Sequence, residues 1–384
     1  MGLSIEFQYF VLFSSLLLLP KVLLRFQIPT ALTALALGFL TTLTLQWFQN
    51  DQLILMLSRL GITSLFLFAG MEVDLEELRE DGAVLTKHLI KTTALIVVTG
   101  VGVHYVFSMP YRAAFILALG LTTPSTGFIL NSLRGFELSE TQEKWVRVTA
   151  IAKELVAIFC LFLILQTETL SGFLISMAAL IAMVLLLPVV FRVFLRVVAP
   201  FAPDSEVSFL IIIALLCGVI TTKIGTYYLV GAFIVGMTAG RFRHFIEHEK
   251  SQNMLYSVSF FFSFFVPFYF YNKGLSFSPE MFSWKGLLLG LTFLVVFLPL
   301  RFSTVLSSIW FFMRDVWKES VAISIPLLPT LIFGLVIAGI LQERFEVPNY
   351  IISGLIVYTL GSSIIPWFFL KKAPPESYDT SMVK

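Results

Sequence analysis

Long apolar segments separated by short polar ones make up most of the chain. Charged residues and Gly/Pro clusters interrupt the apolar sequence at intervals of about 20 residues, the length of a membrane-spanning helix. The pattern predicts thirteen membrane spans, at about 6–24, 28–48, 60–73, 88–107, 112–133, 145–166, 171–192, 206–222, 226–240, 254–272, 286–310, 319–341 and 348–370. The partly polar stretch from Asp51 to Arg59 extends the third span at its start.

The composition predicts an all-α polytopic membrane protein whose main partner is the lipid bilayer. The chain is 58% hydrophobic and 13% charged, against about 25% charged in soluble domains. Basic residues are scattered over loops without forming a block, so no nucleic-acid partner is expected. Cys160 and Cys217 lie inside apolar spans without CxxC spacing, so we expect them to pack helices and expect no cofactor. The first span has no preceding basic segment, so we expect it to be retained rather than cleaved as a signal peptide.

The distribution of Lys and Arg predicts how the chain is oriented. With thirteen spans, eighteen of the 26 Lys and Arg residues fall on one side and six on the other, with Lys153 and Arg301 inside spans. Cytoplasmic loops carry the excess of positive charge. We therefore expect a multi-pass protein of the inner (plasma) membrane, with its N-terminus outside and its C-terminus in the cytoplasm.

Two pairs of short segments suggest an inverted repeat. Residues 66–76 match 270–280 in the positions of Phe, Gly and Glu, at an offset of 204 residues. Residues 34–40 resemble 232–238 in the position of a glycine. Each pair is an odd number of spans apart, so the halves would run in opposite directions across the membrane. Chance similarity between Phe- and Gly-rich segments is the alternative.

The repeat predicts how the chain is divided. The predicted parts are a membrane domain (1–373), made of two halves (1–166 and 206–373) and a linker helix (167–205), and a cytoplasmic tail (374–384). Inverted repeats place binding sites near mid-membrane, where the halves meet.

Glu154 lies in the middle of the sixth span, directly after Lys153. A charge at the bilayer centre costs about 2.5–3.5 kcal/mol on insertion scales, so such a residue indicates a functional site. Neighbours on a helix point about 100° apart and are not natural partners. Either the two side chains bridge each other in a polar cavity or each faces a broken helix. A purely structural ion pair is the alternative.

A helix break is predicted within the fifth span, where residues 121–127 read LTTPSTG. Pro124 removes a helical hydrogen bond, and Gly127 adds backbone freedom. Non-helical backbone at membrane depth persists only where it is buried in protein or lines a cavity. The hydroxyls of Thr123, Ser125 and Thr126 could bind a dehydrated cation. A simple proline kink is the alternative.

The twelfth span, the repeat partner of the fifth, is also interrupted, at Pro326 and at Pro329-Thr330. Two broken helices at equivalent positions, beside a membrane-embedded carboxylate, indicate an ion site to which Thr330 would contribute. Half-helix ends carry about half an elementary charge. Arg301 in the eleventh span would compensate the negative ends, or else would extend to the cytoplasmic surface.

These segments resemble the monovalent cation/proton antiporter superfamily, in particular its branch of sodium/proton exchangers and potassium-efflux systems. FLFAGMEVDLEEL (66–78) is similar to the signature that closes the third span there. LTTPSTGFILNSL (121–133) is similar to the unwound helix, and AIAKELVAIF (150–159) to the helix with the acidic pair. FFVPFYFYNKGLSF (264–277) resembles a tenth-span segment. Arg301 falls where these transporters carry a membrane-embedded Lys or Arg.

The resemblance implies a homodimer with an elevator-like motion of a core that holds the two broken helices. It implies that Glu154 binds a monovalent cation (Na⁺ or K⁺) or H⁺ in competition, because a carboxylate removed from water favours a neutralising partner. Lys153 replaces the polar or acidic neighbour that is usual in the superfamily, which leaves the ion and the coupling open.

The predicted function is therefore a secondary transporter, with Glu154 as the carboxylate that carries the ion. A cation channel or gated potassium-efflux pore of the same fold is one alternative, and it would pass cations without exchanging protons. A non-transporting membrane sensor with a fixed Lys153–Glu154 bridge is another. An enzyme is not expected, because the histidines lie in different segments and no nucleophile motif is present; they are His88, His104, His244 and His248.

Overall fold

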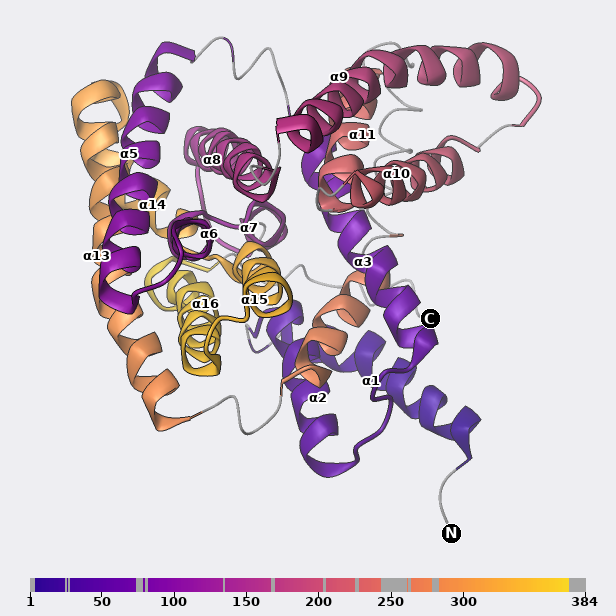
Figure 1. Ribbon diagram of the computed structural model, residues 1–384, viewed down its shortest axis with the longest axis horizontal. Coiled ribbons are helices and arrows are strands. Elements are labelled where there is room, and N and C mark those ends of the chain that lie inside the picture. Colours follow the sequence, from indigo (N-terminus) through magenta and orange to yellow (C-terminus); the bar gives the residue numbers. More distant parts are fainter. Residues whose placement is uncertain are drawn as a thin grey trace, which may run out of the picture.

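The computed structural model is a bundle of helices (Figure 1). It describes residues 4–24, 26, 28–73, 79, 82–133, 135–166, 170–202, 205–224, 228–242, 261, 264–277 and 283–372. The first half of the chain contains α1 (Ile5–Leu24), α2 (Thr30–Thr44), α3 (Gln52–Met71), α5 (Gly82–Phe107), α6 (Tyr111–Thr122), α7 (Thr126–Leu133) and α8 (Glu140–Gln166). The second half contains α9 (Leu170–Val193), η1 (Phe194–Val198), α10 (Glu206–Lys223), α11 (Tyr228–Phe242), α13 (Trp284–Phe312), η4 (Arg314–Glu319), α14 (Ser320–Ser324), η5 (Ile325–Leu327), α15 (Leu331–Phe345) and α16 (Asn349–Phe369). Residues 264–275 are helical as well.

The all-α polytopic class is confirmed, and each predicted span contains helical residues. Within the described ranges, nine helices are long and apolar enough to cross a membrane. A tenth candidate is the pair Val316–Leu327 and Leu331–Phe345, bent by 43° at the break, and two shorter apolar helices lie in α2 and α11. The number of crossings and the orientation stay predictions. Several predicted features lie outside the described residues; they are 74–78, 254–260, the tail 374–384, and His244 and His248.

Side-chain caps set where two of the helices begin. The Asp51 carboxylate accepts the Ile54 N–H (3.0 Å) and the Tyr9 hydroxyl (2.5 Å), so α3 begins at Gln52, within the predicted polar extension of the third span. Ser283 accepts the Gly286 N–H (3.2 Å) at the start of α13. These caps satisfy N–H groups that have no partner within the helix.

The helices pack in two groups that lie side by side (Figure 1). The core group contains α5–α8 and α13–α16: α13 packs along α16, α5 along α6, and α15 against both α6 and α16. The scaffold group contains α1–α3, α9–α11 and the 264–275 helix, with α3 and α10 both packed along α11. α3 also contacts α7, so the scaffold group touches the core group at one of the broken helices.

Four glycines bring scaffold helices into backbone contact. A Cβ at Gly274 would lie 3.0 Å from the Cα of Gly38 in α2, and a Cβ at Gly236 of α11 would lie 2.9 Å from the Cα of Gly70 in α3. Residues without side chains permit this approach. In the sequence repeat, Gly38 corresponds to Gly236 and Gly70 corresponds to Gly274. The contact between Gly38 and Gly274 therefore corresponds to the contact between Gly236 and Gly70. This agreement supports the inverted repeat, which stays a prediction.

Candidate functional site

The two broken helices cross in the interior of the core group. α6 ends at Thr122 and α7 begins at Thr126, while η5 ends at Leu327 and α15 begins at Leu331. The breaks contact each other directly: the Ser125 N–H donates to the Pro329 carbonyl (2.9 Å), and the Ile332 N–H donates to the Ser125 hydroxyl (3.1 Å). Two helix N-termini and two helix C-termini therefore meet at this point, which we call the crossing.

Glu154 of α8 lies at the N-terminus of α7. Its Oε2 atom accepts the Thr126 N–H at 2.9 Å, and the side chain is 3% exposed. The first N–H groups of a helix have no partner within it and carry partial positive charge, which favours an anion there. The half-helix therefore holds the carboxylate in place.

Arg301 and Tyr358 lie at the helix C-termini of the crossing. The Arg301 guanidinium donates to the carbonyls of Leu327 (2.8 Å) and Leu328 (2.7 Å) and to the Tyr358 hydroxyl (2.9 Å). That hydroxyl donates in turn to the Leu121 carbonyl at the end of α6 (2.7 Å). Arg301 is 3% exposed, so the alternative of a side chain extending to the surface is wrong. A cation at helix C-termini compensates their partial negative charge.

Lys153 is buried beside the crossing but does not bridge to Glu154. Among the described residues, no carboxylate lies within 4.0 Å of its ammonium group. Its charge interacts with Arg301 and with the buried imidazole of His88 in α5. The fixed Lys153–Glu154 bridge expected for a non-transporting sensor is therefore not formed.

The four predicted site hydroxyls divide into two kinds. The buried Thr123 hydroxyl has no hydrogen-bond partner among the described residues, and the Thr126 hydroxyl lies beside Glu154 outside hydrogen-bonding geometry. Ser125 instead accepts the Ile332 N–H, and Thr330 contacts hydroxyls of α16, at 3.1 Å for Ser362. Within the described part of the chain, the Ser125 and Thr330 hydroxyls thus contact the other broken helix and α16, whereas that of Thr123 has no hydrogen-bond partner; the role of all four in ion binding stays a prediction.

The four predicted helix-breaking residues all lie at or beside the breaks, but one of them, Gly127, lies inside an α-helix. Pro124 and Pro329 fall within the non-helical segments, and Pro326 lies in the 3₁₀ turn before the second one. The prediction that Gly127 breaks the helix is wrong, because it lies in the first turn of α7. A Cβ there would lie 3.2 Å from the Ile332 side chain and 3.8 Å from that of Leu65, so glycine allows close packing.

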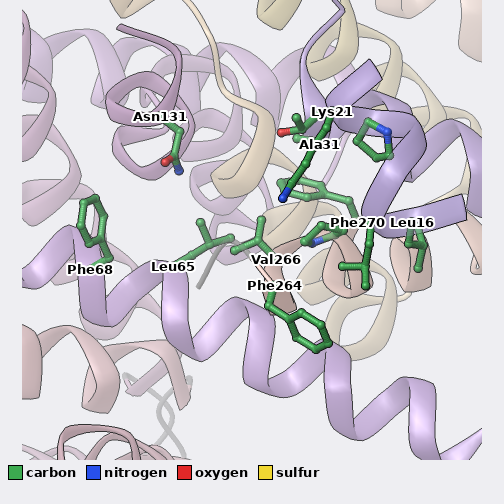
Figure 2. A pocket seen from close by; sticks show the side chains of 13 residues that line it. Leu16, Lys21, Ala31, Leu65, Phe68, Asn131, Phe264, Val266 and Phe270 are labelled. Carbon is green, nitrogen blue, oxygen red and sulfur yellow. The ribbon is translucent and has the colours of Figure 1, made fainter. Parts of the chain in front are cut away.

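A cavity of about 160 Å³ lies between the scaffold group and α7 (Figure 2). Leu65, on its wall, also packs against Gly127, the neighbour of Thr126, so the cavity ends close to the crossing. Its lining is mostly apolar; the residues are Leu16, Leu17, Pro20, Lys21, Thr30, Ala31, Leu65, Phe68, Asn131, Phe264, Val266, Pro267 and Phe270.

Crossed, broken membrane helices beside a buried carboxylate and a buried Arg are the arrangement that secondary transporters use at their ion sites. A sequence model described as "Sodium/hydrogen exchanger, transmembrane" matches residues 11–371. The chain belongs to this family, so the resemblance drawn from its motifs is confirmed. It is a Na⁺/H⁺ antiporter-type membrane transporter whose substrates are a cation and protons.

Individual relatives agree with this assignment. A probable Na⁺/H⁺ antiporter 3 of Methanocaldococcus jannaschii is 24% identical over 285 residues, which cover 71% of each chain. The Na⁺/H⁺-K⁺ antiporter GerN of Bacillus cereus is 25% identical over 295 residues, 71% of this chain and 72% of GerN. The solved structure of the sodium proton antiporter MjNhaP1 from M. jannaschii matches with a TM-score of 0.69 at 14% identity. The match covers 94% of this chain and 96% of the MjNhaP1 chain. This last likeness shows a shared fold.

Proposed function

We propose that this chain exchanges Na⁺ or K⁺ for protons and that Glu154 is the carboxylate that binds each ion in turn. The observation that carries the proposal is the place of this side chain, buried at the crossing with one oxygen on the Thr126 N–H. Glu154 is also the one buried acidic side chain among the described residues. A proton or a monovalent cation bound there neutralises the same single charge.

Competition for one carboxylate couples the two ions. Burial without a neutralising partner is costly for a charged carboxylate, so the site favours a loaded state. The Thr123 and Thr126 hydroxyls supply further oxygen atoms that replace part of a cation's hydration shell. If the core group moves past the scaffold group only when Glu154 is loaded, each movement carries either a cation or a proton. The relatives support both cations: one is a probable Na⁺/H⁺ antiporter and the other a Na⁺/H⁺-K⁺ antiporter.

Lys153 sets the charge that moves with the ion. With Lys153 protonated and Glu154 ionised, the pair is neutral, and it carries one positive charge when either ion is bound. If Lys153 keeps its proton throughout, both loaded states move the same charge, and exchange is one for one and electroneutral. If Lys153 instead loses its proton when the cation binds, two protons return per cation and exchange is electrogenic. Unbalanced movement would couple to the membrane potential at about 2.3 kcal/mol per charge per 100 mV.

We further propose the arrangement in the membrane that the sequence predicts. The N-terminus lies outside, the C-terminus lies in the cytoplasm, and the protein is a homodimer of the inner membrane. The inverted halves 1–166 and 206–373 are joined by a linker helix at 167–205. Accessibility labelling of single cysteines placed in the loops, in a variant that lacks Cys160 and Cys217, tests the orientation.

Reconstitution tests the transport proposal. Purified protein is placed in liposomes with an imposed pH gradient and a pH-sensitive dye, and Na⁺, K⁺ and Li⁺ are added in turn. We expect Na⁺ or K⁺ to dissipate the gradient, with protein-free liposomes as the control. Cation uptake without proton movement would identify a channel and contradict antiport.

A further inference from the structure

Lys21 is the one charged residue among the described residues that line the cavity between the scaffold group and α7. It lies in the last turn of α1 and is exposed. Figure 2 shows its side chain extending from α1 into the cavity, which it shares with Asn131 of α7. Asn131 donates to the Gly127 carbonyl (2.8 Å), so its amide is held on the α7 wall.

This lining is unusual for a route taken by cations. Carboxylates and converging carbonyl groups concentrate cations in a vestibule, yet none of the described lining residues carries a carboxylate. The polar side chains are those of Lys21, Thr30 and Asn131, and the remaining lining residues are apolar. An ammonium group in such a space repels an entering cation and gives it no ligand.

We propose that Lys21 limits the entry of cations from this cavity to Glu154 and thereby sets the apparent cation affinity on this side of the membrane. The inference rests on the proposed function and deepens it. Cations entering the cavity meet the positive field of Lys21 before they reach the crossing. The effect is electrostatic, so it depends on the charge of the side chain and on ionic strength, and the shape of the side chain matters little.

The size of the effect follows from Coulomb's law. For two unit charges separated by about 8 Å in a hydrated space, the repulsion changes an apparent affinity about two- to five-fold, depending on the effective dielectric constant. The Debye length is about 30 Å at 0.01 M salt and about 3 Å at 1 M salt. The contribution of Lys21 is therefore fully present at low ionic strength and screened at high ionic strength.

A charge series at position 21 tests this inference. The apparent cation Km is measured for wild type, Lys21→Arg, Lys21→Gln and Lys21→Glu, at about 0.01 M and about 1 M choline chloride. Both everted and right-side-out membrane vesicles are used, so that either side of the protein is exposed. Lys318→Gln is the matched control, because Lys318 is also exposed, falls on the same predicted side and does not line the cavity.

We expect Lys21→Arg and Lys318→Gln to behave as wild type. In one vesicle orientation and at low salt, Lys21→Gln should lower the Km about two- to five-fold and Lys21→Glu should lower it further. At high salt the differences should disappear. A Km independent of the charge at position 21 in both orientations, or a shift that persists at high salt, would overturn the inference. Absence of exchange in wild type would instead reject the proposed function.

Discussion

Tyr358 provides the sharpest test of how the crossing is held together. Its buried hydroxyl donates to the Leu121 carbonyl (2.7 Å) and accepts from Arg301 (2.9 Å), so it joins the end of α6 to the cation of α13. In an unbroken helix the Ser125 N–H would donate to the Leu121 carbonyl. Here it donates to the Pro329 carbonyl across the crossing, so the Leu121 carbonyl is left to the Tyr358 hydroxyl. Replacement by Phe removes this hydroxyl and keeps the ring.

The structure gives the magnitude of the expected loss. The buried Leu121 carbonyl would lose its donor, which costs about 1–3 kcal/mol, and the charged Arg301 would lose one of three hydrogen bonds, worth about 1.5–3 kcal/mol. We therefore expect Tyr358→Phe to lower the free energy of unfolding by about 2.5–6 kcal/mol. Water reaching the gap would place the result at the lower end of this range.

Equilibrium unfolding in mixed micelles, titrated with sodium dodecyl sulfate, measures this difference. Tyr350→Phe is the matched control, because Tyr350 lies on the same helix, its ring stacks under Lys285, and its hydroxyl makes no hydrogen bond to a described residue. The control should stay within about 0.5 kcal/mol of wild type. If Tyr358→Phe were equally stable, the hydroxyl would not join the two helix ends, and this account of the crossing would be wrong.

Three further predictions address the ion site, the charge balance and the scaffold. Replacing Thr123 or Thr126 by Ala should raise the apparent Km for the cation in liposome assays without ending transport, whereas an unchanged Km in both variants would support a simple proline kink. If Lys153 stays protonated, the rate of cation/proton exchange should not respond to a membrane voltage set by valinomycin and K⁺, in a preparation where K⁺ is not a substrate. An exchange rate that follows the voltage would contradict this. Gly236→Ala should destabilise the protein by about 1–3 kcal/mol in the same unfolding titration, because the added methyl group overlaps the α3 backbone. Gly102→Ala, where nothing lies within 4 Å, should be neutral by comparison.

Features with a local signal could be predicted from the sequence. Pro124 and Pro329 remove backbone N–H groups, so both breaks could be located within a few residues. Glu154 could be identified because a carboxylate inside an apolar span is costly and therefore rare. The start of the third span could be extended to Asp51 because the stretch from Asp51 to Arg59 is only partly polar, and the cap that Asp51 provides became visible only in the structure.

Contacts between distant parts of the chain could not be predicted. Tyr358 carried no signal, because its partners Leu121 and Arg301 lie 237 and 57 residues away. A buried tyrosine needs a hydrogen-bond partner, yet the sequence does not say which one. The role of Gly127 was misassigned for the same reason, since the side chain that packs closely against it belongs to Ile332 in the other broken helix.

The surroundings of Lys153 also depended on the fold. Adjacent residues on one helix point in different directions, and only the packing of α8 decides what each one faces. Glu154 faces the N-terminus of α7, whereas the charge of Lys153 interacts with Arg301 and His88. The sequence left both a bridge and separate environments open, and the described residues contain no bridge.

Proton movement by a Glu154→Gln variant in liposomes tests the central claim most directly. The amide is nearly the same size and can still accept the Thr126 N–H, so the crossing should remain folded, which the unfolding titration verifies. It cannot bind or release a proton at neutral pH. We predict that neither Na⁺ nor K⁺ dissipates a pH gradient through this variant, under conditions where wild type does so. Exchange at the wild-type rate would contradict the role of Glu154 as the shared carrier of cation and proton.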